Sequence, residues 1–242
     1  MIGFSLIDVD TNTDHQLMVD IAEAATIWAG ATLTGRASPF GWDFTASVRV
    51  GSSTSDCLPG EWPILLITHP DVADAGGYHE QDKQGRPLLK IFPKLLDDPA
   101  TQLAGVVTHE IGEAGADPEC ARMMMGADGR IRAIEICDAV EQQNIQIKIP
   151  SGKIILCSAF ITPAWMVKPQ DVTGIPMAVG DGTEGIQPGQ VLVGGYMSYF
   201  ENGTWTQEVN GEKSSYRRAV AGLYQDRHYK RATRMVAAHA AP

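Results

Sequence analysis

Two stretches of the chain repeat apolar residues at helical spacing. Between residues 14 and 29 the apolar positions share one face, and Thr13 and Gln16 stand at the spacing of a capping box. Between residues 99 and 114 the pattern returns, with Pro99 in the first turn and Gly115 just past the end. We predict two amphipathic helices. The buried stripe of the second is predicted at Leu103, Val106, Val107 and Ile111.

Shorter runs predict strands. Residues 47–50 alternate apolar and polar side chains, and residues 62–68 are continuously apolar, which favours a central strand buried on both faces. Residues 88–92 are a third candidate, after a polar loop with turn signals. Residues 145–149 and 153–160 are expected to form two strands joined by a Pro-Ser-Gly turn.

The pattern changes along the second half of the chain. A further helix is expected at 131–142. Residues 171–211 contain nine glycines and little helical periodicity, and Asn202-Gly203 stands between two strand-like runs, as in a hairpin. We therefore expect an α+β body at 1–162, a Gly-rich β subdomain at 163–212 and a C-terminal arm at 213–242.

Composition supports a globular protein. The chain has 242 residues, of which 44% are hydrophobic and 20% charged, values typical of a domain with an apolar core. No apolar run approaches the roughly 20 residues of a membrane span, and the N-terminal residues lack the pattern of a secretory signal. The four cysteines form no CxxC pair, so reduced thiols are expected.

Charge is divided unevenly along the chain. The net charge is −10, yet residues 213–242 hold seven bases and one acid, or +6, which leaves −16 for the rest. The acidic body argues against nucleic acid as the main partner. The arm could be a solvated tail, a docking element for an acidic protein, or a nucleic-acid contact, and its interleaved tyrosines favour docking. The partner-binding candidates are Arg217, Arg218, Arg227, Lys230, Arg231 and Arg234.

The candidate chemistry lies on the second predicted helix. His109 and Glu113 are four residues apart and so face the same side, with Glu110 between them. In the HExxH arrangement two histidines bind zinc and the glutamate is the general base for a metal-bound water. Here the second histidine is replaced by Glu113. A carboxylate is an acceptable zinc ligand, but it makes the site harder and more open to other divalent ions.

Further ligands must come from elsewhere. Glu135 and Asp138 are three residues apart and share a face if residues 131–142 are helical. Asp117 is a nearer candidate, although its position before Pro118 also suits a turn cap. His79, after a Gly-Gly-Tyr turn, is either a plain loop histidine or a residue that faces a ligand or a substrate.

The run HEIGEAGADP and the later run EICDAVE resemble a group of tailed-phage proteins with the pattern HExxE, DP and ExCD. Those proteins are described as virion-associated or metalloprotease-like, and secreted exordium-like proteins of plants show a similar pattern. The resemblance implies a zincin-like fold, with Zn²⁺ or another divalent ion held by His109, Glu113 and one or both of Glu135 and Asp138, and with Glu110 as the base. The chain departs from the pattern at Gly112 and Gly115, where close approach of another segment would explain the glycines.

Two functions follow as expectations. The first is a structural component of a phage virion, at the head, neck or tail, made in the host cytoplasm. Its β subdomain and arm would contact other virion proteins in a symmetric assembly, with no membrane partner. The alternative is an active zinc metallopeptidase that uses Glu110 as general base and an edge strand at 88–92 to align its substrate.

Overall fold

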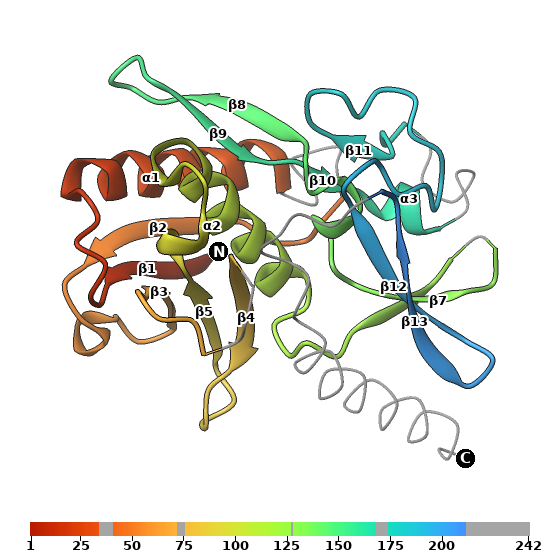
Figure 1. Cartoon of the computed structure of the whole chain (residues 1–242), viewed down its shortest axis with the longest axis horizontal. Helices are drawn as coiled ribbons and strands as arrows, with labels where there is room; N and C mark the ends of the chain where they lie inside the picture. The colour runs from red at the N-terminus through yellow and green to blue at the C-terminus, as the bar shows by residue number, and fades with distance from the viewer. Residues whose placement is uncertain (34–40, 72–75, 127, 168–173, 212–242) are drawn as a thin grey trace.

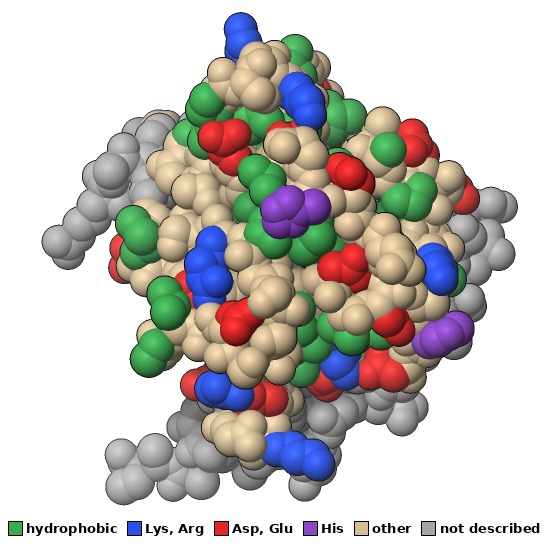
Figure 2. Space-filling model, turned by 90° about the vertical axis from the view of Figure 1, so that its left-hand side faces the viewer, with side chains coloured by type: hydrophobic (Ala, Val, Ile, Leu, Met, Phe, Trp, Pro, Cys, Tyr) green, Lys and Arg blue, Asp and Glu red, His purple; other side chains and the backbone are tan. Residues whose placement is uncertain are grey.

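The computed structural model describes residues 1–33, 41–71, 76–126, 128–167 and 174–211. The structure is mixed, with several sheets and few helices, and is compatible with the expected α+β class. Among the described residues no helix is both long and apolar enough to cross a membrane. On the face shown in Figure 2, acidic, basic and hydrophobic side chains are interspersed.

A five-stranded mixed sheet carries the first half of the chain, in the order β2-β1-β3-β5-β4 (Figure 1). Strands β1 (Ile2–Asp8), β2 (Ala46–Gly51), β3 (Glu61–Leu66) and β5 (Pro87–Ile91) run parallel to one another. Strand β4 (Gly77–Gln81) pairs antiparallel with β5 and ends the sheet. The last strand before the motif helix is therefore flanked by an antiparallel neighbour.

The two predicted helices are present. Helix α1 (His15–Trp28) packs on β2, and helix α2 (Pro99–Ala116) packs on β4 and β5 as well as on α1. Every residue of the predicted stripe on α2 is buried. The N-cap of α1 is Asp14, whose side chain accepts a hydrogen bond from the Leu17 N–H, so the predicted capping role of Thr13 was wrong.

A second, four-stranded antiparallel sheet has the order β13-β12-β7-β6. Its strands are β6 (Met123–Met125), β7 (Ile131–Ala133), β12 (Tyr196–Glu201) and β13 (Thr204–Val209). The expected hairpin between β12 and β13 is confirmed, and its turn residues Asn202 and Gly203 have positive φ. Because β7 pairs with β12, this sheet combines strands from both sides of residue 162.

A long hairpin of β8 (Asn144–Lys148) and β9 (Ile154–Ser158) packs on α1 and α2, as expected from the two strand-like runs (Figure 1). The Trp28 Nε1–H of α1 donates to the Ser158 carbonyl at 3.0 Å, and this bond fixes the hairpin to the helix. The remaining elements are η1 (Ala29–Leu33), η2 (Thr54–Asp56), η3 (Pro93–Leu95), η4 (Asp138–Val140), β10 (Phe160–Ile161), α3 (Pro163–Met166) and β11 (Ala178–Val179).

The prediction of a helix at residues 131–142 was wrong. The segment begins as β7, continues without regular structure, and ends in the single turn η4. Residues 132–140 are all buried, and a run that is buried at every position shows no periodicity that separates a helix from an extended chain. Residues 88–92 were also wrongly expected at the sheet edge, because β5 lies between β3 and β4.

Candidate metal centre

Helix α2 supplies three side chains to one buried cluster. His109, Glu110 and Glu113 are exposed by only 3%, 1% and 3%. The spacing of four residues places His109 and Glu113 on the same face, and His109 Nε2 lies 3.0 Å from Glu113 Oε1. The sequence motif is therefore a compact group of donors in the interior of the protein.

The chain after β7 brings a fourth side chain to the cluster. Asp138, at the start of η4, is 1% exposed, and its Oδ1 lies 3.2 Å from His109 Nε2. Glu135 is equally buried, but the two acids do not share a helical face as expected, because this segment is not a helix. Asp138 therefore reaches the site through the η4 turn.

Glycine explains how this segment comes so close to α2. A Cβ at Gly112 would lie 3.1–3.3 Å from Trp28, Cys137 and Ile136. On the other side of the turn, a Cβ at Gly195 would lie 2.7 Å from the carbonyl oxygens of Asp138 and Ala139. The turn that carries Asp138 is thus held between α2 and the residue just before β12.

The second glycine of the motif, Gly115, also permits the close approach of another segment. A Cβ at Gly115 would overlap the ring of Phe44, which lies directly on α2. The expectation that Gly112 and Gly115 serve the close approach of other segments is confirmed. The two motif glycines are therefore a packing feature of this chain.

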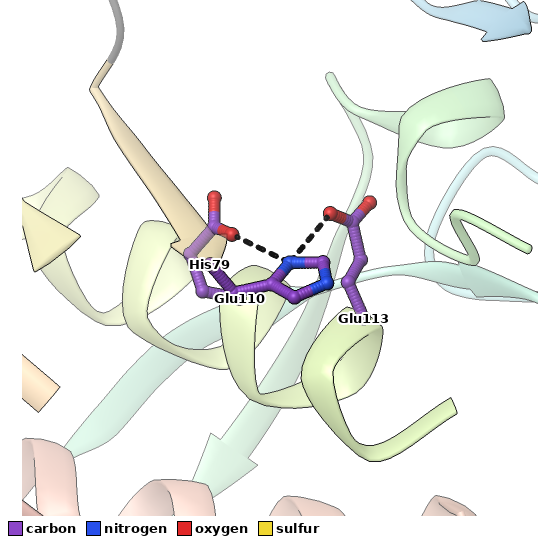
Figure 3. Close-up of side chains that lie close together, drawn as sticks. All are labelled: His79, Glu110 and Glu113. Carbon is purple, nitrogen blue, oxygen red and sulfur yellow. Dashed lines mark ion pairs between the residues drawn. The ribbon is translucent and has the colours of Figure 1, made fainter. Parts of the chain in front are cut away.

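Strand β4 adds His79, which is fully buried. Its Nδ1 lies 3.5 Å from Glu110 Oε2 and 3.8 Å from Glu113 Oε2, so the imidazole stands between two carboxylates (Figure 3). Gly77 lets β4 approach α2, because a Cβ there would lie 2.9 Å from Val106. His79 is therefore a buried strand residue and not a plain loop histidine.

Asp117 lies close by but performs a different task. Its two carboxylate oxygens accept hydrogen bonds from the backbone N–H groups of Ala121 and Arg122, each at 2.9 Å. These bonds cap the turn that follows α2. Of the two roles that the sequence left open for Asp117, the structure shows the cap.

Burial and mutual repulsion shape the electrostatics of the cluster. Burial is the main cause that raises the pKa of Glu113 to about 8; the negative charge of Asp138 and, more weakly, that of Glu135 raise it further, and the nearby His109 lowers it. Burial also holds the pKa of the Cys137 thiol well above its usual range, with a smaller contribution from Glu113. A bound cation would relieve the cost of ionising these carboxylates.

The donor atoms fit a divalent metal ion. His109, Glu113 and Asp138 each offer one ligand atom, and the three atoms lie within 4.8 Å of one another. Tetrahedral bonds of 2.0–2.2 Å to zinc place neighbouring ligand atoms about 3.4 Å apart, close to the 3.0 and 3.2 Å measured from His109 Nε2. Glu135 belongs to neither group of donors found among the described residues.

The chain matches no protein-family model, no curated protein and no solved structure. The resemblance to phage proteins therefore stays an expectation from the sequence. The six basic residues proposed to bind a partner lie outside the described residues, as does the whole arm from residue 213.

A pocket adjoins the centre. It has a volume of about 140 Å³ and is bordered by α2, by β9 and by the chain before β8. His109 lines it together with Gln102, Glu141 and Ser158. One of the candidate ligands therefore faces both the cluster and a hollow large enough for several water molecules.

Proposed function

We propose that this protein binds a divalent transition-metal ion, first of all Zn²⁺, in a zincin-like core through His109, Glu113 and Asp138. The observation that carries the proposal is the convergence of one imidazole and two carboxylates, all nearly inaccessible, within 4.8 Å. Imidazole and carboxylate are both ligands of zinc, and the two oxygen donors also suit Mn²⁺. The order of elements supports the zincin-like assignment, since the strands of the sheet precede the helix that carries the motif.

Metal content tests this proposal. We expect the purified protein, dialysed after loading with Zn²⁺, to retain zinc measurable by elemental analysis. His109→Ala and Asp138→Asn should lose at least nine-tenths of the zinc held by these ligands. Asp117→Asn should retain it, because the Asp117 carboxylate caps a turn.

The control variant is His69→Ala, which removes an exposed imidazole. Circular dichroism of each variant separates loss of a ligand from loss of the fold. Folded His109→Ala and Asp138→Asn that hold as much zinc as the wild type would contradict the assignment.

We propose further that this metal-binding core belongs to a structural component of a tailed-phage virion. The support is the resemblance of the motif runs HEIGEAGADP and EICDAVE. Other virion proteins would be the partners, with the basic arm as one contact. Mass spectrometry of purified particles should find the full chain, whereas a chain ending at residue 212 should be missing; incorporation of the shortened chain at the normal level would remove the arm from the proposal.

Hydrolysis of a peptide bond is a second candidate function. The position of β4 favours it, because this antiparallel strand ends the sheet and carries His79 into the cluster. A substrate backbone could pair with β4 as an added strand, and Glu110 would accept the proton of the attacking water. A bound zinc ion would supply a Lewis acid and lower the pKa of that water.

Cleavage of a casein substrate tests this candidate. The wild type should cleave, and Glu110→Gln should lose at least 100-fold in kcat, since it keeps the shape of the side chain but removes the base. If the zinc-loaded wild type cleaves no casein, peptide hydrolysis is contradicted and only the structural role stands.

A further inference from the structure

The two oxygens of the Glu113 carboxylate face different imidazoles. Glu113 Oε1 lies 3.0 Å from His109 Nε2, whereas Glu113 Oε2 lies 3.8 Å from His79 Nδ1. The two histidines come from different elements, α2 and β4, and each is almost fully buried. Glu113 is thus placed between two groups of donor atoms.

The second group consists of His79, Glu110 and Glu113. Its ligand atoms also lie within 4.8 Å of one another, and Figure 3 shows the imidazole of His79 between the two carboxylates. The distances of 3.5 and 3.8 Å from His79 Nδ1 are near the separation of about 3.4 Å between neighbouring ligands of a tetrahedral ion. This group has the composition and the spacing of a metal site in its own right.

The surroundings of His79 favour a ligand role. Its Nε2 lies 3.3 Å from the carbonyl oxygen of Asp117, which can only accept, so in the neutral imidazole the proton is on Nε2 and the Nδ1 lone pair faces the two carboxylates. A histidine that binds a metal typically donates its other N–H in this way to a carbonyl or carboxylate. The carbonyl is itself held in place, because the Asp117 side chain caps the following turn.

Charge balance points in the same direction. Four carboxylates, Glu110, Glu113, Glu135 and Asp138, lie in the cluster or next to it, each exposed by 3% or less. Cations stabilise carboxylates in their ionised form at such depth, and two divalent ions carry the charge that matches four carboxylates.

From this geometry we infer a two-metal centre in which Glu113 bridges two divalent transition-metal ions. One ion is held by His109, Glu113 Oε1 and Asp138, and the other by His79, Glu110 and Glu113 Oε2. The inference rests on the proposed metal-binding function and extends it. It also changes the role of Glu110 from a base to a ligand, and any hydrolysis would then use a pair of ions, as two-metal hydrolases do.

Metal stoichiometry and spectroscopy test the inference. Metal-free protein titrated with Zn²⁺ should bind two ions per chain, whereas Glu110→Gln and His79→Ala should each bind one, and so should Asp138→Asn. With Mn²⁺, the doubly loaded wild type should give the electron paramagnetic resonance spectrum of an exchange-coupled pair. Glu110→Gln should give the spectrum of an isolated ion.

The controls keep charge and residue type comparable. Glu80 lies on the same strand as His79, but its carboxylate pairs with Lys90 outside the cluster. The Glu80→Gln variant should therefore still bind two ions. One ion in the wild type, unchanged in Glu110→Gln, would overturn the two-metal inference and leave the single site standing. No bound ion in the wild type would overturn both, and two ions still bound to folded Glu110→Gln and His79→Ala would place the second ion elsewhere.

Discussion

Glycines of α2 differ in what surrounds them, although all three sit in the same helix. Gly112 and Gly115 face side chains of other segments at distances that leave no room for a methyl group without movement. At Gly105 the nearest neighbours of a Cβ, Asn144 Oδ1 and the Leu156 carbonyl, would be 3.7 and 3.8 Å away. Gly105 therefore carries only the usual cost of glycine in a helix, whereas the other two permit contacts.

The substitution Gly115→Ala should destabilise the protein relative to Gly105→Ala. Alanine gains about 1 kcal/mol of helix propensity at either position, but at Gly115 the added methyl group overlaps the Phe44 ring and must displace it, at a cost of about 1–3 kcal/mol. Urea denaturation of both variants measures the difference. Equal free energies of unfolding would show that Phe44 moves aside without cost.

At the scale of elements, one glutamate connects three strands of the large sheet. Glu61 on β3 accepts hydrogen bonds from Ser5 on β1 and from Arg49 on β2, both at 2.7 Å. The Arg49 contact is the largest of the causes that lower the pKa of Glu61 to about 2. The ionised carboxylate is therefore part of what holds the parallel strands in register.

Acid should weaken this connection in a defined pH range. Because the folded-state pKa of Glu61 lies below its ordinary value of 4.5, the stabilisation is complete above about pH 4.5 and is lost as the pH falls towards about 2. Glu61→Gln should cost about 1–2 kcal/mol at pH 7, since Arg49 is partly exposed. Its unfolding free energy should also fall less steeply between pH 5 and pH 3.

Chemical denaturation across this pH range measures the effect, with Glu184→Gln at an exposed position as the control. If the free energy of unfolding falls equally with pH in the wild type and in Glu61→Gln, the Glu61 hydrogen bonds are not a source of acid sensitivity.

Elements with a clear periodicity could be predicted from the sequence, and the others could not. The helices α1 and α2 and the β12–β13 hairpin lie where their patterns place them. Strand β4 lies in the segment predicted as a polar loop, because its five residues begin with glycine and do not alternate between apolar and polar side chains. Strand order is set by contacts between distant segments, so the position of β5 inside the sheet had no local signal.

At the scale of the whole molecule, the candidate centre joins side chains from three separate parts of the fold. His79 belongs to the edge of the large sheet, His109 to α2, and Asp138 to the turn packed beneath β12 of the second sheet. The spacing of the HExxE motif predicted the first pair of donors, because a helix fixes that geometry. The contribution of β4 depends on how the sheet packs on α2, which the sequence alone does not reveal.

Because the centre connects these parts, metal binding should stabilise the molecule as a unit. With free zinc at 100 times the dissociation constant of one site, the expected gain is about 2.7 kcal/mol, or a rise of about 5–10 °C in Tm for a protein of this size. Hydrogen exchange should slow at residues 77–81 and 135–140, which carry ligands. In the outer part of the β8–β9 hairpin, away from the centre, it should change little.

His69→Ala should show the same rise in Tm, and EDTA should reverse it. His109→Ala should show a smaller rise, because it removes the donor shared by the shortest contacts of the cluster but leaves the group of His79, Glu110 and Glu113 in place. An equal rise in His109→Ala would mean that zinc stabilises the protein from another site. A rise without protection at residues 135–140 would mean that Asp138 is not a ligand, since the ion would then leave the η4 turn as free to open as before.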